Sequence, residues 1–136
     1  MDDLSFILIL FLLLFIAIIV GLVMLVSKSK KQAEESEQNI VRMINSLPEG
    51  KRTAFMLQLN NVRKNPTTAV ILALLLGNVG GHKFYLGQTG MGIVYILFAW
   101  TTIPGWIAII EAFSIGAKTA QYNEKKAQEY LHMFSA

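Results

Sequence analysis

The fold is decided by the stretch Gly77-Asn78-Val79-Gly80-Gly81-His82-Lys83-Phe84-Tyr85-Leu86-Gly87, which separates two uncharged apolar segments. The first segment, Thr67–Leu76, is too short to cross a bilayer alone. The second, Met91–Ile110, gives about 30 Å of helix, which is enough to cross. Neither segment has the polar face of a soluble amphipathic helix. The pattern predicts a membrane hairpin whose first arm either borrows residues from the turn or enters the membrane without crossing it.

The turn between the two arms carries the most specific pattern. Its glycines permit positive φ and close backbone approach. A histidine, a lysine and two aromatic residues follow, a combination that anchors well at a membrane boundary. The turn motif consists of Gly77, Gly80, Gly81, His82, Lys83, Phe84, Tyr85 and Gly87.

Small residues recur at every fourth position on both arms, and such ridges let two helix backbones pack closely in lipid. The alternative is that alanine and glycine are simply common in apolar helices. The predicted ridges are Ala69, Ala73, Gly77 and Gly81 on the first arm, and Ala108, Ala112, Gly116 and Ala120 on the second.

Asn78 and Glu111 are the intramembrane polar residues of the hairpin that are candidates for a role. A carboxylate in a membrane is costly unless it is paired or protonated, and it is a functional candidate by default. For Glu111 we expect a structural pair with Arg63, Lys64, Lys118 or the threonines at 67 and 68, with an ion or proton site as the alternative. For Asn78 we expect capping of exposed backbone near the turn.

A helix kink is predicted at Pro104 and Gly105, because proline removes one backbone hydrogen bond and clashes with the preceding turn. The hydroxyl groups of Thr101 and Thr102 are placed to satisfy the freed backbone. Trp100 and Trp106 would lie deep for an interfacial belt, which leaves open a division of the second arm into two shorter helices.

An additional span is predicted at the N-terminus. Leu4–Val26 holds 23 residues without a charge, about 35 Å of helix. The preceding residues are acidic and no cleavage site follows, so a retained anchor is favoured over a signal peptide. Because basic residues concentrate on the cytoplasmic side, the N-terminus is expected outside and the C-terminus in the cytoplasm. Eleven of the 12 Lys and Arg residues then lie inside, and Lys83 lies alone at the external tip.

The connector and the tail are polar and helical in composition. Helices are expected over Gln32–Leu47 and about Pro48–Val62, with a capping box at Ser46-Leu47-Pro48-Glu49. The stripe of Ile40, Ile44 and Leu47 is expected to pack on the chain's own helices, although pairing with another protein or contact with the inner leaflet stays open. The expected apolar partner is the tail edge formed by Ala127, Tyr130, Leu131 and Phe134.

Taken together, these motifs predict an all-α integral membrane protein with three transmembrane helices and a helical cytoplasmic connector. The expected divisions are an N-terminal anchor at 1–27, a cytoplasmic connector at 28–65, a two-helix membrane hairpin at 66–116 and a cytoplasmic C-terminal helix at 117–136.

The hairpin resembles the TM-two domain family, whose members carry a two-transmembrane-helix domain, over roughly residues 64–128. The resemblance rests on the turn motif, on Gly90 and Gly92, on Pro104-Gly105-Trp106, on Glu111 and on the run from Gln121 to Ala127. Eukaryotic relatives carry Asp-Arg-Phe where this chain has His82-Lys83-Phe84, so no signalling role is carried over. The resemblance implies a small bacterial membrane protein and no enzymatic activity.

Several function classes are excluded by composition. The chain has no cysteine and two histidines, which are predicted on opposite sides of the membrane, so no metal site, catalytic residue or cofactor-binding residue is expected. Acidic residues interleave the basic ones, and this pattern argues against nucleic-acid binding.

The sequence favours a small scaffold or accessory subunit of the bacterial inner membrane that forms homo-oligomers and organises a membrane protein partner. The alternative is a channel or transport accessory that uses Glu111. A third reading, a factor in envelope stress or phage exclusion, has no support in the residues.

Overall fold

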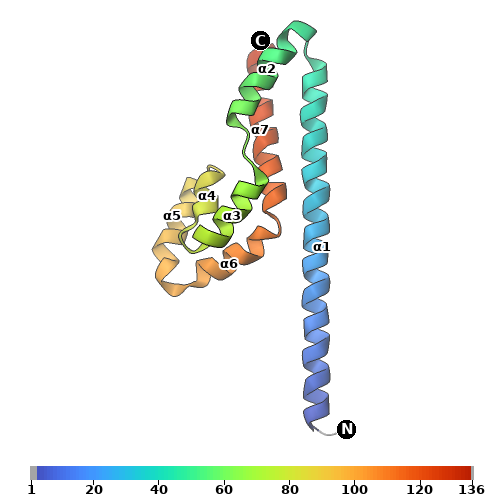
Figure 1. Cartoon of the computed structure of the whole chain (residues 1–136), viewed down its shortest axis with the longest axis vertical. Helices are drawn as coiled ribbons and strands as arrows, with labels where there is room; N and C mark the ends of the chain where they lie inside the picture. The colour runs from blue at the N-terminus through green and yellow to red at the C-terminus, as the bar shows by residue number, and fades with distance from the viewer. Residues whose placement is uncertain (1–2, 136) are drawn as a thin grey trace.

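The computed structural model describes residues 3–135, and within that range every element is helical, which confirms the all-α prediction. The elements are α1 (Asp3–Ser46), α2 (Glu49–Val62), α3 (Pro66–Leu76), η1 (Gly77–Val79), α4 (Gly81–Tyr85), α5 (Thr89–Phe98), η2 (Ala99–Thr101), α6 (Ile103–Ala112) and α7 (Ile115–Ser135). Figure 1 shows α1 as a long helix that runs the length of the molecule along one side, with the other helices gathered beside its C-terminal half and middle.

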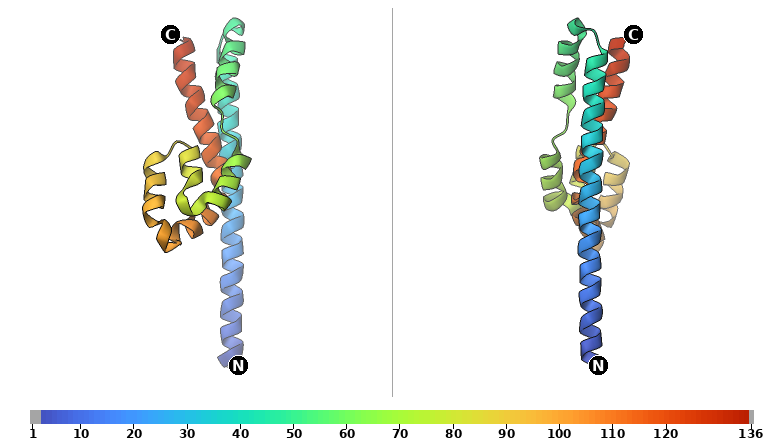
Figure 2. Two further views of the ribbon diagram at one scale, coloured as in Figure 1. Left: turned by 60° about the vertical axis from the view of Figure 1, so that its left-hand side comes forward. Right: turned by 90° about the vertical axis from the view of Figure 1, so that its right-hand side faces the viewer.

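The N-terminal half of α1 stands clear of the rest of the chain (Figures 1 and 2). Its large apolar side chains from Leu4 to Val20 are exposed, and the buried residues of the helix begin at Ser29. Within residues 3–135, α1 is the one helix long and apolar enough to cross a membrane. It continues without a break past the predicted boundary at residue 27, because the polar segment that follows is itself rich in good helix formers.

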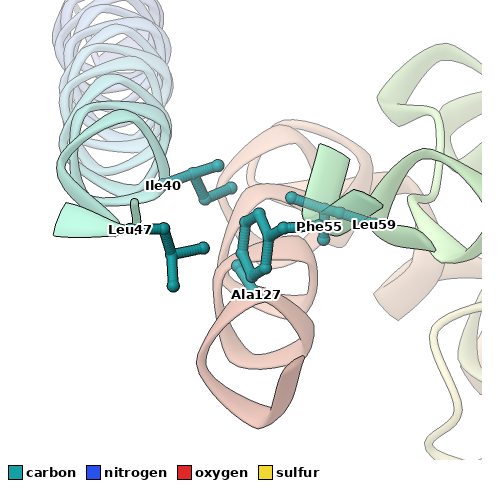
Figure 3. Packing of buried hydrophobic residues seen from close by; sticks show 5 residues of the cluster. All are labelled: Ile40, Leu47, Phe55, Leu59 and Ala127. Carbon is teal, nitrogen blue, oxygen red and sulfur yellow. The ribbon is translucent and has the colours of Figure 1, made fainter. Parts of the chain in front are cut away.

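The C-terminal half of α1 packs with α2 and α7 into a three-helix bundle. Ile40, Leu47, Phe55, Leu59 and Ala127 form its buried core (Figure 3). Partly buried residues surround this core, namely Met43, Ile44, Val62, Tyr130, Leu131 and Phe134. The expectation that the connector stripe packs on the chain's own helices and on the tail edge is therefore confirmed.

The predicted capping box at Ser46 is wrong. Ser46 is the last residue of α1, and its hydroxyl donates to the carbonyl of Met43 at 2.7 Å instead of capping the next helix. The N-cap position of α2 is Pro48, whose side chain cannot accept a hydrogen bond. Arg52 ties the corner together by donating from Nε to the carbonyl of Leu47 at 2.8 Å.

Residues 66–112 form a compact unit of short helices rather than two long arms. α3 contacts α4 and α6, and α4 lies beside α5 (Figure 2). Met91–Ile110 is not one continuous helix, since α5 ends at Phe98 and α6 begins at Ile103. The second arm is thus divided into two shorter helices, which is the alternative that the positions of Trp100 and Trp106 left open. The loop between α4 and α5 lies at the end of the unit nearer the bundle, and η2 lies at the end nearer the N-terminus of α1 (Figure 1).

The chain reverses at η2 without a proline kink. Thr102 adopts a left-handed conformation with φ 60°, and Pro104 then sits in the first turn of α6. At that position its missing N–H has no intrahelical partner to lose. No carbonyl is freed by Pro104 at this position, and the Thr101 hydroxyl instead donates to the carbonyl of Phe98 at 2.7 Å. The expected kink at Pro104 and Gly105 is thus a helix end followed by a new start.

Polar contacts order the chain at both ends of the compact unit. The backbone N–H of Ala117, near the start of α7, donates to Ser29 Oγ of α1 at 3.3 Å. Asn65 caps α3 by accepting from the backbone of Thr67 at 2.8 Å, and Pro66 occupies the first turn. The start of α7 therefore lies at the level where the uncharged part of α1 gives way to its first lysines.

Candidate functional site

Glu111 is the centre of a charge cluster inside the compact unit. Its Oε1 accepts from Lys83 Nζ at 2.6 Å and from Lys118 Nζ at 2.7 Å. Its Oε2 lies 2.8 Å from His82 Nε2 and accepts from the Tyr95 hydroxyl at 2.9 Å. One carboxylate on α6 thereby joins α4, α5 and α7.

The cluster depends on the close approach of α4 and α5. Gly80, the N-cap residue of α4, has φ 72°, and a Cβ at this position would lie 2.7 Å from Tyr95 Cβ. The same Cβ would lie 3.3 Å from the Cα of Gly92. Glycine is required here for both the backbone angle and the space. α4 then carries the consecutive residues His82 and Lys83 to the same carboxylate.

Lys83 lies in the interior of the unit, and the prediction of an exposed tip is wrong. Its side chain is 5% exposed, and its ammonium group also lies 5.5 Å from the centre of the Tyr95 ring. A lysine is buried in this way only when a partner holds its charge. The sequence did not reveal the pair between Lys83 and Glu111, because the two residues lie 28 positions apart in the chain.

Of the predicted partners of Glu111, Lys118 is found and the others have different roles. Arg63 pairs with Glu37. Lys64 lies 4.9 Å above the ring of Tyr85. The threonines at 67 and 68 donate their backbone N–H groups to Asn65.

His82 is fully buried and contacts the cluster through one ring nitrogen. A carboxylate needs donors, so the hydrogen-bond network assigns the proton to Nε2. Nδ1 has no partner within residues 3–135. The His82 ring meets the Tyr95 ring edge-on, with centres 5.6 Å apart.

Asn78 stabilises the reversal of the chain at η2. Its Nδ2 donates to the carbonyl of Ala99 at 2.9 Å, and its Oδ1 accepts from the backbone of Gly105 at 3.2 Å. A Cβ on Gly105 would lie 3.3 Å from Asn78 Oδ1. The asparagine therefore links η1 to both η2 and α6, at the site where the sequence predicts backbone capping.

Some of the predicted small-residue positions pack between the two arms, and others face different neighbours. Gly77 faces Ala108, because a Cβ on the glycine would lie 2.5 Å from the alanine Cβ. Ala69 and Ala73 are buried, and Ala112 packs against their cluster. Two positions face elsewhere: Gly81 lies against Leu76 of its own arm, and Gly116 faces Ser29 of α1.

The remaining turn residues pack within the unit. The ring of Phe84 covers Gly92, where a Cβ would lie 2.6 Å from the ring. The Tyr85 hydroxyl accepts from the backbone of Asn65 at 2.9 Å. Gly87 has φ 72°, which closes the loop between α4 and α5.

Two structural residues escaped sequence reasoning, Tyr95 and Asn123. The side chain of Asn123 accepts from the backbone N–H of Lys64 at 2.7 Å and donates to its carbonyl at 3.0 Å. Tyr95 carries the one side-chain polar group between Met91 and Ala99, and that isolation is the signal that could have identified it. Within residues 3–135, no three His, Asp or Glu side chains gather closely enough to hold a metal ion.

The chain combines an exposed apolar helix that is long enough to cross a membrane with a compact unit of short apolar helices. These features define a helical membrane protein. Within it, residues 62–113 match the TM2 domain family, which confirms the resemblance drawn from the turn motif. The matched segment ends short of residue 128, to which the resemblance was extended, so Lys118 lies outside it.

A relative from Bacillus subtilis (strain 168), the uncharacterised membrane protein YozV, is 57% identical over 49 residues. The aligned stretch is 36% of this chain and 62% of the relative. No solved structure matches the chain.

Proposed function

We propose that this protein is a small, non-catalytic membrane scaffold or accessory subunit that self-associates and organises a partner. The observation that carries the proposal is the full engagement of Glu111, whose two oxygens contact four side chains from three helices. A carboxylate used in this way holds the unit in one conformation. A rigid body of this kind serves to present surfaces to other proteins.

The transport alternative has less support. A transport residue must exchange its partners for a passing ion or proton, and a pathway needs further polar groups along it. Here both lysines approach the same oxygen of Glu111 at 2.6 and 2.7 Å. Asn78, the other polar residue of the hairpin, is engaged on both sides by backbone.

The proposed membrane placement has α1 crossing the bilayer, while the α3–α6 unit enters from the cytoplasmic side and returns to it. α3 has 11 residues, about 17 Å of helix, which is half of a hydrocarbon core. Lys83 and Lys118 meet at one carboxylate, so all 12 Lys and Arg residues come to one side. The positive-inside rule then favours an external N-terminus and a cytoplasmic C-terminus, in the inner membrane of a bacterium.

Self-association is proposed through the free half of α1. Ala17 and Gly21 stand four positions apart, and a Cβ built on Gly21 would meet no atom of another described element within 4 Å. Small residues at this spacing permit close packing of two membrane helices. The large residues around them are exposed, so a second copy or a partner span has access to this face.

Cross-linking in native membranes, read by mass spectrometry, tests the proposal. We expect cross-links between copies that are lost in Gly21→Leu and kept in the neighbouring control Val20→Leu. Wild-type protein in liposomes is expected to conduct no ions. Ion flux by the wild type that disappears in Glu111→Gln, without cross-linked copies, would establish the transport alternative instead.

A further inference from the structure

A polar groove of about 460 Å³ runs between the α4–α5 loop and α7. Its walls include three lysines, Lys118, Lys125 and Lys126, together with Gln88, Gln121 and Tyr122. Gly87 forms part of the floor, where a Cβ would lie 3.6 Å from the Tyr122 ring. The loop and the helix surface together make a concave site.

The groove carries an excess of positive charge. Lys126 pairs with Glu129 at 2.6 Å, and this hydrogen bond raises the pKa of the lysine and lowers the pKa of the carboxyl group. Glu111 is shared between Lys118 and the buried Lys83. Among the residues that line the groove, three lysines face the single carboxylate of Glu129, so the groove has a net positive charge that suits an anion.

Hydrogen-bond donors are available in the groove. Within residues 3–135, the side chains of Lys125, Gln88 and Gln121 make no hydrogen bond to protein groups. Lys118 is 31% exposed on its side chain, and an ammonium group with three donors retains capacity beyond its bond to Glu111.

The position of the groove relative to the membrane follows from the contact of α7 with α1. Ser29, three residues beyond the uncharged segment that ends at Val26, contacts Ala117, the neighbour of Lys118. In the proposed membrane placement, on which this inference rests, the end of the groove at Lys118 therefore lies at the height of the phosphate groups of the inner leaflet.

We infer that this groove binds the phosphate of an anionic phospholipid. The lysines supply the charge that recognises the phosphodiester, and the glutamine amides and the Tyr122 hydroxyl supply neutral donors to its oxygens or to headgroup hydroxyls. The phosphate of the lipid balances the positive charge of the groove and fixes the depth of the compact unit.

The test is native mass spectrometry of the full chain in detergent, titrated with phosphatidylglycerol or phosphatidylcholine of identical acyl chains. The wild type is expected to retain phosphatidylglycerol in preference to phosphatidylcholine. Lys125→Gln should lower the phosphatidylglycerol affinity about fivefold, the equivalent of about 1 kcal/mol for one lysine near anionic lipid. Gln121→Trp should produce a similar loss by filling the groove without a change in charge.

Lys31→Gln is the matched control, because it removes one exposed lysine from the same face of the membrane, outside the groove. It is expected to leave the affinity unchanged. Equal losses in Lys31→Gln and Lys125→Gln, with wild-type binding in Gln121→Trp, would show diffuse surface attraction and overturn the inference. Displacement of the lipid by millimolar inorganic phosphate would overturn it as well. The membrane placement itself has a separate test, given at the end of the Discussion.

Discussion

Glu111 is the residue on which the compact unit depends most. Removing one partner of a buried ion pair leaves the other charge desolvated, which is far more costly than losing a surface pair. The partner left behind is Lys83, whose side chain is 5% exposed, and the fully buried His82 loses its carboxylate at the same time. The electrostatic stability of three helices therefore rests on one side chain.

Glu111→Gln is expected to lower the free energy of unfolding by about 3–5 kcal/mol, because it leaves the buried lysine without a counter-charge. Equilibrium unfolding in mixed micelles, followed by circular dichroism, measures the change. Glu129→Gln removes a carboxylate from the exposed pair with Lys126 and serves as the control, with no measurable loss expected. Equal stability of the two variants would contradict the role of Glu111 as the counter-charge of the buried lysine.

Gly77→Ala tests the closest contact between η1 and α6. The backbone at Gly77 is right-handed, with φ −60° and ψ −38°, so alanine is tolerated conformationally and the effect reports packing alone. The added methyl group overlaps Ala108, and we expect a loss of about 1–3 kcal/mol. Gly90→Ala, with open space around its Cβ, should be neutral or stabilising. A larger loss of stability in Gly90→Ala than in Gly77→Ala would show that η1 and α6 are not in contact.

At this scale the sequence identified the important residue but not its partners. Glu111 stood out because a carboxylate among apolar residues is unusual. Lys118 was within reach because it lies seven positions away. Lys83, His82 and Tyr95 could not be assigned, since their contacts depend on the reversal of the chain at η1 and η2, which periodicity does not encode.

Among the elements, the three-helix bundle was the most predictable. Ile40, Ile44 and Leu47 recur at helical spacing on α1, and the apolar edge of α7 provides the matching surface. Amphipathic helices of this kind show their buried faces in sequence. The short helices of the compact unit are apolar on all sides, so neither their ends nor their partners could be read from a pattern.

Phe55→Ala should destabilise the bundle by about 3–5 kcal/mol, because this ring is fully buried and packs edge-on against Phe134 with centres 5.9 Å apart. Leu57→Ala on the same helix removes a side chain that is 62% exposed and should change little. Hydrogen exchange across α2 and α7 measures both. Equal protection in the two variants would show that the bundle core is not centred on this ring.

The reversal at η2 is set by Thr102 rather than by Pro104. Thr102→Gly is expected to stabilise the protein by about 1 kcal/mol, since glycine adopts φ 60° without the Cβ clash of threonine. Pro104→Ala should change the stability by less than this, because no helical hydrogen bond is restored. Thermal unfolding in detergent compares the two. A marked stabilisation by Pro104→Ala alone would support a kinked continuous helix instead.

For the molecule as a whole, the sequence placed Lys83 at an exposed tip between two crossings, whereas the structure buries its side chain against Glu111. The prediction of three crossings followed from the length of Met91–Ile110 and required Lys83 at an external tip. The break between α5 and α6 and the pair between Lys83 and Glu111 remove that requirement. The account then has one full crossing, a unit that enters and returns, and every basic residue on one side.

Sided labelling of the α4–α5 loop tests this arrangement most directly. The chain contains no cysteine, so Gln88→Cys and the C-terminal reference Met133→Cys each provide one thiol at an exposed position. The account predicts that a membrane-impermeant maleimide labels both in inverted vesicles and neither in right-side-out vesicles. Labelling of Gln88→Cys from the outside, with Met133→Cys protected there, would contradict it.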